Sequence, residues 1–202
     1  MSGYPVLLEG AFIRALVVGG GAAAVRKTRA LLVAGALVRI VATKASGEMH
    51  ALAEQSGCIV DERPYCTKDL DGATLVIVAT NDRALNAAVA RDARARGMLV
   101  NVADAPGDGT FVTLATHRSG DVTIAISAGG VPGAAVRVRD AIAARFDARY
   151  AAAVRALGAL RATYLAAGDR EGWERAQEAL ITDAFCARVE SGALLEDVAA
   201  WR

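Results

Sequence analysis

The sequence predicts an α/β fold: an N-terminal, mostly parallel sheet, then a small β-hairpin with a helix, then a helical C-terminal region. Three observations carry this prediction. Short apolar runs alternate with helical patterns through the first half of the chain, which is the order of parallel strands and their crossover helices. After Pro106, turn residues separate two strand-like runs. From Gly133 onward, Ala, Arg and Leu dominate, which favours helices.

The first predicted strand leads straight into glycines. Apolar residues 15–18 precede three consecutive glycines and then a helical pattern. Glycines let the backbone turn sharply and approach a diphosphate, while a helix N-terminus offers unpaired N–H groups and a positive dipole end. Ala24 suits close packing of helix on strand. The pattern favours a Rossmann-like dinucleotide site, although a plain strand-to-helix turn also uses glycines. The predicted cofactor-binding residues of this turn are Gly19, Gly20, Gly21, Ala22, Ala23 and Ala24.

The following elements continue the alternation. Gly35 and Gly97 suit positions just after helices, and Asn81 is a good N-cap. Residues 74–79 are apolar almost throughout, as in a strand buried on both faces. The expected helices are 25–34, 47–55 and 84–96, and the expected strands are 37–41, 58–60, 74–79 and 98–102.

In the second half of the chain, the alternation of strands and helices ends. Residues 111–115 and 122–127 are expected as strands of a hairpin joined by residues 117–121, which places His117 near the turn. Helices are expected within 133–166, 171–181, 183–190 and 194–201. We therefore expect three domains, comprising residues 1–112, 113–146 and 147–202.

Composition excludes several classes of protein. The 202 residues carry a formal net charge of +1 with acids and bases interspersed, so no nucleic-acid partner is expected. No signal-type start or membrane-length apolar run occurs, which predicts a cytoplasmic protein without membrane contact. The three cysteines are widely spaced and the two histidines lack a ligand-spaced partner, so neither a disulfide framework nor a protein metal site is expected.

Polar residues follow two neighbouring strands, at the sheet edge where ligands of open α/β folds bind. Thr80 and Asn81 follow one strand and are assigned to the cofactor, although capping explains Asn81 equally well. Asp104 follows the other and is the predicted catalytic residue. A carboxylate beside a nicotinamide could accept or position a proton as hydride leaves the substrate. Organising the turn before Pro106 is the alternative role.

The choice of dinucleotide is less determined by the sequence. The acid expected about twenty residues beyond the glycines, where it would bind the ribose, is missing, and Thr43 and Lys44 stand in that region. Lys44 and Arg39 leave a 2′-phosphate open, whereas the Thr43 hydroxyl could hold an adenosine ribose. NAD is the predicted cofactor, with Thr43 and Lys44 among its binding residues.

These motifs together resemble the siroheme synthase dehydrogenase module, the precorrin-2 dehydrogenase family, some members of which are also sirohydrochlorin ferrochelatases. The resemblance runs in order from about Pro5 to Phe146. The NVxDAP element at 101–106 and the SxGG element at 127–130 are its most specific parts. The other elements are residues 18–21 with Ala24, Arg26 and Lys27, then 31–32, 34–36, 79–82, Asn86 and Phe111.

The resemblance implies NAD-dependent oxidation of precorrin-2 to sirohydrochlorin, on the way to siroheme or a cobalamin. It implies a homodimer paired through the middle hairpin domain, and it matches Asp104 to the family's catalytic aspartate. The same carboxylate could strip pyrrole protons for insertion of Fe²⁺ or Co²⁺. The carboxylates of a tetrapyrrole need basic or N–H donors. The candidates for this contact are Ser127, Gly129, Gly130, Arg137, Arg139 and, less strongly, His117.

The sequence departs from the family pattern at two places, and two functions other than the dehydrogenase remain open. Ala128 replaces a second serine common in the family, and Pro132 is shifted, so tetrapyrrole placement and metal insertion can differ here. The methyltransferase of larger fused enzymes lies beyond the resemblance and is not expected. The alternatives to the dehydrogenase are a non-catalytic NAD-sensing module and a metal-inserting enzyme with a vestigial cofactor site.

Overall fold

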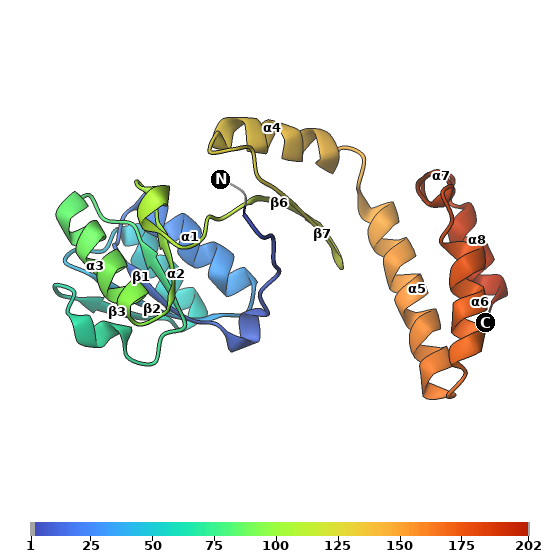
Figure 1. Ribbon diagram of the computed structural model, residues 1–202, viewed down its shortest axis with the longest axis horizontal. Helices are drawn as coiled ribbons and strands as arrows, with labels where there is room; N and C mark the ends of the chain where they lie inside the picture. The colour runs from blue at the N-terminus through green and yellow to red at the C-terminus, as the bar shows by residue number, and fades with distance from the viewer. Residues whose placement is uncertain (1–2, 202) are drawn as a thin grey trace. The chain divides into compact units, whose positions relative to one another are not determined.

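The computed structural model describes residues 3–201 (Figure 1). The described chain forms two compact units, with the boundary between Thr113 and Leu114. In the part that the structure describes, no helix combines the length and apolar character needed to cross a membrane.

The N-terminal unit is built on a five-stranded sheet in the order β3-β2-β1-β4-β5, and every pair of neighbours is parallel. The expected mostly parallel sheet is therefore confirmed and, in these five strands, wholly parallel. Its strands are β1 (Arg14–Val18), β2 (Leu37–Ala42), β3 (Ile59–Glu62), β4 (Leu75–Val78) and β5 (Leu99–Val102). Its helices are α1 (Ala22–Val33), α2 (Gly47–Ser56) and α3 (Arg83–Ala95), with short 3₁₀ turns η1 (Gly10–Phe12), η2 (Thr67–Leu70) and η3 (Pro106–Asp108).

The sheet is covered on both faces because its strands bury side chains in alternate directions. Val17 and Ile77 pack with α1 and α2 in one apolar cluster, whereas Val18 and Val78 pack with α3 in another. All four residues of β4 are buried, as the apolar run predicted. The carboxyl ends of β1, β4 and β5 consequently lie side by side, in a register that aligns Val18 with Val78 and Val78 with Val102.

One capping prediction in this unit is wrong. The N-cap of α3 is Asp82 rather than Asn81, because the Asp82 carboxylate accepts hydrogen bonds from the N–H groups of Ala84 and Leu85 at 2.9 and 3.0 Å. Asn81 is thereby released from capping, and it lies in the exposed loop between β4 and α3.

The C-terminal unit contains an antiparallel hairpin followed by five helices. The hairpin pairs β6 (Ala115–Ser119) with β7 (Val122–Ile126). The helices are α4 (Pro132–Ala143), α5 (Ala148–Ala166), α6 (Arg170–Leu180), α7 (Phe185–Ser191) and α8 (Ala193–Ala200). Tyr150, Leu160, Leu180 and Leu194 are among the buried residues of its core.

The hairpin begins later than expected. Residues 111–114 are not strand, because Phe111 packs on the core of the N-terminal unit and its carbonyl accepts a hydrogen bond from Asn101. His117 lies within β6, and the loop is only two residues long. Gly120, with φ +55°, occupies the first loop position, as is typical of a type II′ turn. The helical stretch from residue 133 is broken before Ala148, where Asp147 caps α5.

The structure does not test the expected separation at residue 146. Contacts join the hairpin to α5 within the C-terminal unit, and the Ser119 hydroxyl donates a hydrogen bond to the Asp147 carbonyl at 2.8 Å. The division into domains at 1–112, 113–146 and 147–202 stays a prediction.

Candidate functional site

The glycine turn between β1 and α1 is fixed by its neighbours. Gly19 has φ +130°, and a Cβ at this position would clash with the carbonyl of Ala79. A Cβ at Gly20 would clash with the carbonyl of Lys44, while the Gly20 carbonyl accepts a hydrogen bond from Ser46 N–H at 3.0 Å. The turn therefore lies against the loops after β4 and β2, and side chains are excluded there by the backbone.

Gly21 differs from the two glycines before it, because no atom lies within 4 Å of a Cβ built on it. It is the N-cap of α1 and supplies no side-chain cap, and the first turn of α1 contains no acidic residue. The first N–H groups of the helix have no intrahelical acceptor. An open, unneutralised helix N-terminus of this kind fits a diphosphate.

The turn borders a cavity of about 540 Å³ at the carboxyl edge of the sheet. This volume lies within the range of small-molecule and cofactor sites. The cavity brings together the predicted cofactor residues Gly19, Gly20, Gly21, Thr43, Lys44, Thr80 and Asn81. Ala22, Ala23 and Ala24 form the first turn of α1 and do not line it; Ala24 is fully buried against the sheet.

The lining of the cavity also includes Arg63 and Tyr65, which no sequence motif pointed to. The Arg63 guanidinium donates hydrogen bonds to both carboxylate oxygens of Asp69, so its charge is already paired. Burial, with Asp92 nearby, raises the pKa of Tyr65 to about 12. Both side chains follow β3, a short strand that carries no glycine or capping signal to mark the loop after it.

Arg39 does not support a 2′-phosphate site. Its guanidinium donates to the Asp69 carbonyl at 2.6 Å and pairs with the Asp69 carboxylate at 3.5 Å. Lys44 remains exposed at the cavity. Glu62, at the end of β3, accepts a hydrogen bond from Ala45 N–H at 2.7 Å, and this bond lowers the pKa of its carboxyl. The Glu62 carboxylate of β3 thus contacts the loop that follows the neighbouring strand β2.

Asp104 lies two residues beyond the end of β5, at the same edge. Its Oδ1 accepts a hydrogen bond from Asn86 Nδ2 at 3.0 Å, and its Oδ2 lies 3.7 Å from an Arg83 nitrogen. The second terminal nitrogen of the Arg83 guanidinium lies 3.0 Å from an Asp108 carboxylate oxygen. The Asp104 side chain is 44% exposed, so it is both held in place and open to solvent.

Asn86 joins Asp104 to the cavity wall. It is fully buried in the first turn of α3, and its amide group contacts Thr80 as well as Asp104. Because Thr80 lines the cavity, only one side chain separates that wall from the carboxylate. A group bound in the cavity and a substrate at Asp104 would therefore be neighbours.

The predicted substrate-binding residues all belong to the C-terminal unit. Ser127, Gly129 and Gly130 form the loop between β7 and α4, with positive φ at both glycines. Arg137 and Arg139 follow on α4, where the Arg139 guanidinium is paired with Asp140. The sixth, His117, is not the turn residue that was expected: its Nε2 lies 2.6 Å from the Phe146 carbonyl.

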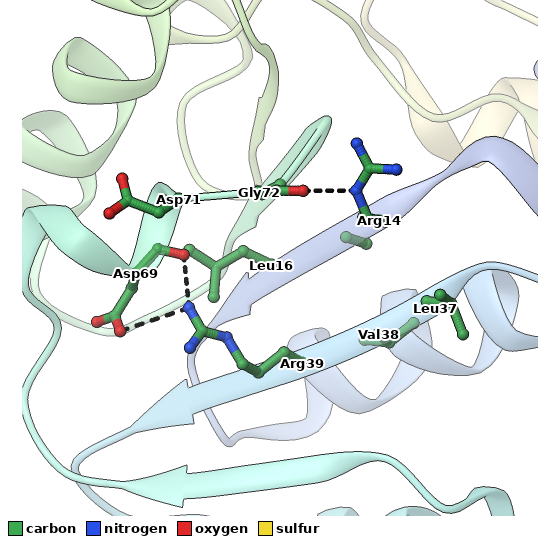
Figure 2. Close-up of a pocket in the computed structure, with 10 residues that line it drawn as sticks. Arg14, Leu16, Leu37, Val38, Arg39, Asp69, Asp71 and Gly72 are labelled. Atoms are coloured by element: carbon green, nitrogen blue, oxygen red, sulfur yellow. Dashed lines mark hydrogen bonds and ion pairs between the residues drawn. The ribbon is translucent and has the colours of Figure 1, made fainter.

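A second, smaller hollow of about 190 Å³ lies near the amino ends of β1 and β2. Figure 2 shows that its polar groups already bind one another: Arg14 Nε donates to the Gly72 carbonyl at 2.7 Å, and Arg39 pairs with Asp69. Groups that are satisfied in this way stabilise the fold and leave little to attract a ligand. Among residues 3–201 no cluster of three or more His, Cys, Asp or Glu side chains could hold a metal ion.

Comparisons with known proteins agree with this geometry. The NAD_binding_7 family model, described as "Putative NAD(P)-binding", matches residues 7–115. The siroheme synthase of Pseudomonas entomophila strain L48 is 48% identical over 117 residues, or 58% of this chain and 25% of that protein. The siroheme synthase of Pseudomonas fluorescens strain SBW25 is 44% identical over 117 residues, which are again 58% of this chain and 25% of that protein. The chain thus spans about a quarter of the length of these relatives.

One solved structure resembles the whole chain. "SirC, precorrin-2 dehydrogenase" matches with a TM-score of 0.77 and 25% sequence identity, and the match covers 98% of this chain and 99% of that one. The likeness therefore includes the hairpin and the helical region as well as the sheet, which confirms the expected fold class.

Proposed function

Because the chain belongs to the NAD_binding_7 family, we propose that it is a precorrin-2 dehydrogenase, which oxidises precorrin-2 to sirohydrochlorin with NAD. The observation that carries the proposal is the connection from the cavity wall at Thr80, through Asn86, to the half-exposed carboxylate of Asp104. Proton transfer from a substrate requires a carboxylate at that place, whereas a non-catalytic NAD-sensing module does not.

The residues present fit a dinucleotide. The open helix N-terminus at Gly21 suits the diphosphate, and we assign the ribose to the hydroxyl of Thr43, which lines the cavity. NAD is favoured over NADP because, of the two cations Arg39 and Lys44, only Lys44 lines the cavity, and Arg39 is engaged by Asp69. When bound, the nicotinamide supplies the acceptor for a hydride.

Asp104 supplies the other half of the oxidation. Converting precorrin-2 to sirohydrochlorin removes two hydrogens, one as a hydride and one as a proton. Asp104 accepts the proton at its carboxylate and passes it to solvent, to which the side chain is open. The Asn86 amide holds the carboxylate in position while it does so.

The C-terminal unit binds the substrate in this proposal. The N–H groups of the loop at Ser127, Gly129 and Gly130, with the guanidinium groups of Arg137 and Arg139, suit the many carboxylates of a tetrapyrrole. His117 has a smaller part because its ring already contacts the Phe146 carbonyl. We further propose that the protein acts in the cytoplasm as a homodimer paired through the hairpin.

Anaerobic incubation of the protein with precorrin-2 and NAD tests this function. We expect NADH absorbance to rise in step with the sirohydrochlorin spectrum. Binding of NAD without any NADH formation would favour a sensing module instead. Adding Fe²⁺ or Co²⁺ to sirohydrochlorin without NAD then measures metal insertion separately, since a metal-inserting enzyme would be active in that step alone.

A further inference from the structure

We propose that Asn86 is the positioning residue of the reaction, which fixes the Asp104 carboxylate relative to the cofactor cavity; this inference rests on the proposed dehydrogenase function. Asn86 was noted in the sequence only as one element of a family resemblance. Its side chain is fully buried and makes contacts on two sides.

The hydrogen bonds of Asn86 fix which way its amide points. Nδ2 donates to the Thr80 carbonyl at 3.1 Å and to Asp104 Oδ1 at 3.0 Å. Oδ1 accepts from the Thr80 hydroxyl at 2.6 Å. In the flipped orientation, the amide oxygen would face both a carbonyl and a carboxylate, with no hydrogen to share. The donor side of the amide is thus committed to Asp104.

The helix that carries Asn86 is itself anchored. Asp82 caps α3 immediately before its first turn, and its carbonyl accepts a hydrogen bond from Asn86 N–H at 2.9 Å. Arg83 and Asn86 are three residues apart and lie on one side of the helix, where both reach Asp104. Arg83 is 59% exposed and its contact with Asp104 is 3.7 Å long, so the buried amide is the stronger constraint.

This arrangement couples two loops that could otherwise move independently. Thr80 belongs to the loop after β4 and Asp104 to the loop after β5, and Asn86 binds both at once. A misplacement of about 1 Å at a reacting group costs on the order of 100-fold in rate. Loss of the Asn86 donor is therefore expected to lower kcat by about 10- to 100-fold.

The Asn86→Leu variant removes this role in the full chain. Leucine is branched at Cγ as asparagine is, but it carries no charge and offers no N–H to Asp104. We expect kcat for precorrin-2 oxidation to fall at least about tenfold, while the Kd for NAD, measured by calorimetry, changes less than about threefold. Arg91→Ala, at an exposed position of the same helix, is the matched control and is expected to retain the wild-type kcat.

A double-mutant cycle separates positioning from a general structural role. If Asn86 acts through Asp104, Asn86→Ala lowers the rate in the wild-type background and adds less than about a twofold loss to Asp104→Ala. The thermal unfolding of each variant is measured alongside its rate. Unfolding of both Asn86 variants at assay temperature would overturn the proposal in favour of a structural role.

The remaining outcomes distinguish this inference from the proposed function. A wild-type kcat in Asn86→Leu, or an equal loss from Asn86→Ala in both backgrounds, overturns the positioning role while wild-type turnover upholds the dehydrogenase. Absence of NADH formation by the wild-type protein overturns the dehydrogenase, and the role of Asn86 falls with it.

Discussion

The ammonium group of Lys27 lies 2.7 Å from the carboxamide oxygen of Asn101, and so joins α1 to the end of β5. Lys27 also donates to the Thr113 hydroxyl at 3.2 Å, and the Asn101 amide donates to the Phe111 carbonyl at 3.0 Å. Burial lowers the pKa of Lys27, and the positive charge of Arg26 beside it lowers this pKa further. This contact fixes the segment at the end of the N-terminal unit.

Replacing Lys27 by methionine removes this contact and leaves the Asn101 oxygen, on a side chain only 4% exposed, without its donor. A buried polar group left unsatisfied costs about 1 to 3 kcal/mol. We expect the free energy of unfolding of the variant to fall by that amount in urea titrations. Arg26→Met, at the exposed neighbouring position, should change it by less than about 0.5 kcal/mol; equal effects of the two substitutions would contradict a special role for the Lys27 contact.

The three glycines of the turn should respond differently to alanine. Gly19→Ala places a methyl group against the Ala79 carbonyl at a positive φ, so we expect marked loss of stability. Gly21→Ala meets no atom within 4 Å, and we expect its melting temperature to stay near that of the wild type. Because Gly21 lines the cavity, its methyl group should nevertheless weaken NAD binding at least about tenfold, roughly 1.4 kcal/mol. Calorimetry with NAD measures this difference, and unchanged affinity would place the diphosphate elsewhere.

Stability in acid should depend on Asp69. Its side chain is 3% exposed, and hydrogen bonds from Arg63 lower its pKa from the ordinary 3.8 to about 2. A carboxyl group with a lowered pKa in the folded state stabilises the protein above the unfolded pKa, and this contribution is lost as pH falls through the folded value. We expect about 2 kcal/mol of stabilisation near neutral pH that disappears between about pH 4 and pH 2.

Urea unfolding of the wild type and of Asp69→Asn at several pH values measures this contribution. The stability difference between the two proteins should be constant above about pH 5 and should shrink as the pH approaches 2. A difference that stays constant down to pH 2 would show that Asp69 does not titrate in this window.

Much of the fold could be predicted because local signals and burial agree. The glycines at 19–21 and the apolar run at 74–79 specify the turn and the interior strand β4 by sterics and burial alone. The start of the hairpin could not be predicted from the sequence. Phe111 is a residue type common in strands, but its side chain packs against the core of the N-terminal unit. Asp82 became the N-cap rather than Asn81 because its carboxylate reaches two N–H groups.

The site was predicted less completely for a related reason. Glycines and strand ends pointed to the cavity, whereas Arg63, Tyr65 and Glu62 arrive from β3, whose place beside β2 no local pattern reveals. The geometry of Asn86 depends on three segments meeting in space, and a lone asparagine inside a helical pattern carries no signal of that meeting.

The proposed dehydrogenase reaction requires Asp104 to take the proton released from precorrin-2. The most direct measurement compares single-turnover rates of NADH formation in the wild type, Asp104→Asn and the control Asp71→Asn, whose carboxylate is also paired with an arginine. With NAD saturating, we expect Asp104→Asn to slow the reaction at least about 100-fold, with NAD affinity preserved and Asp71→Asn matching the wild type. A wild-type rate in Asp104→Asn would contradict the account.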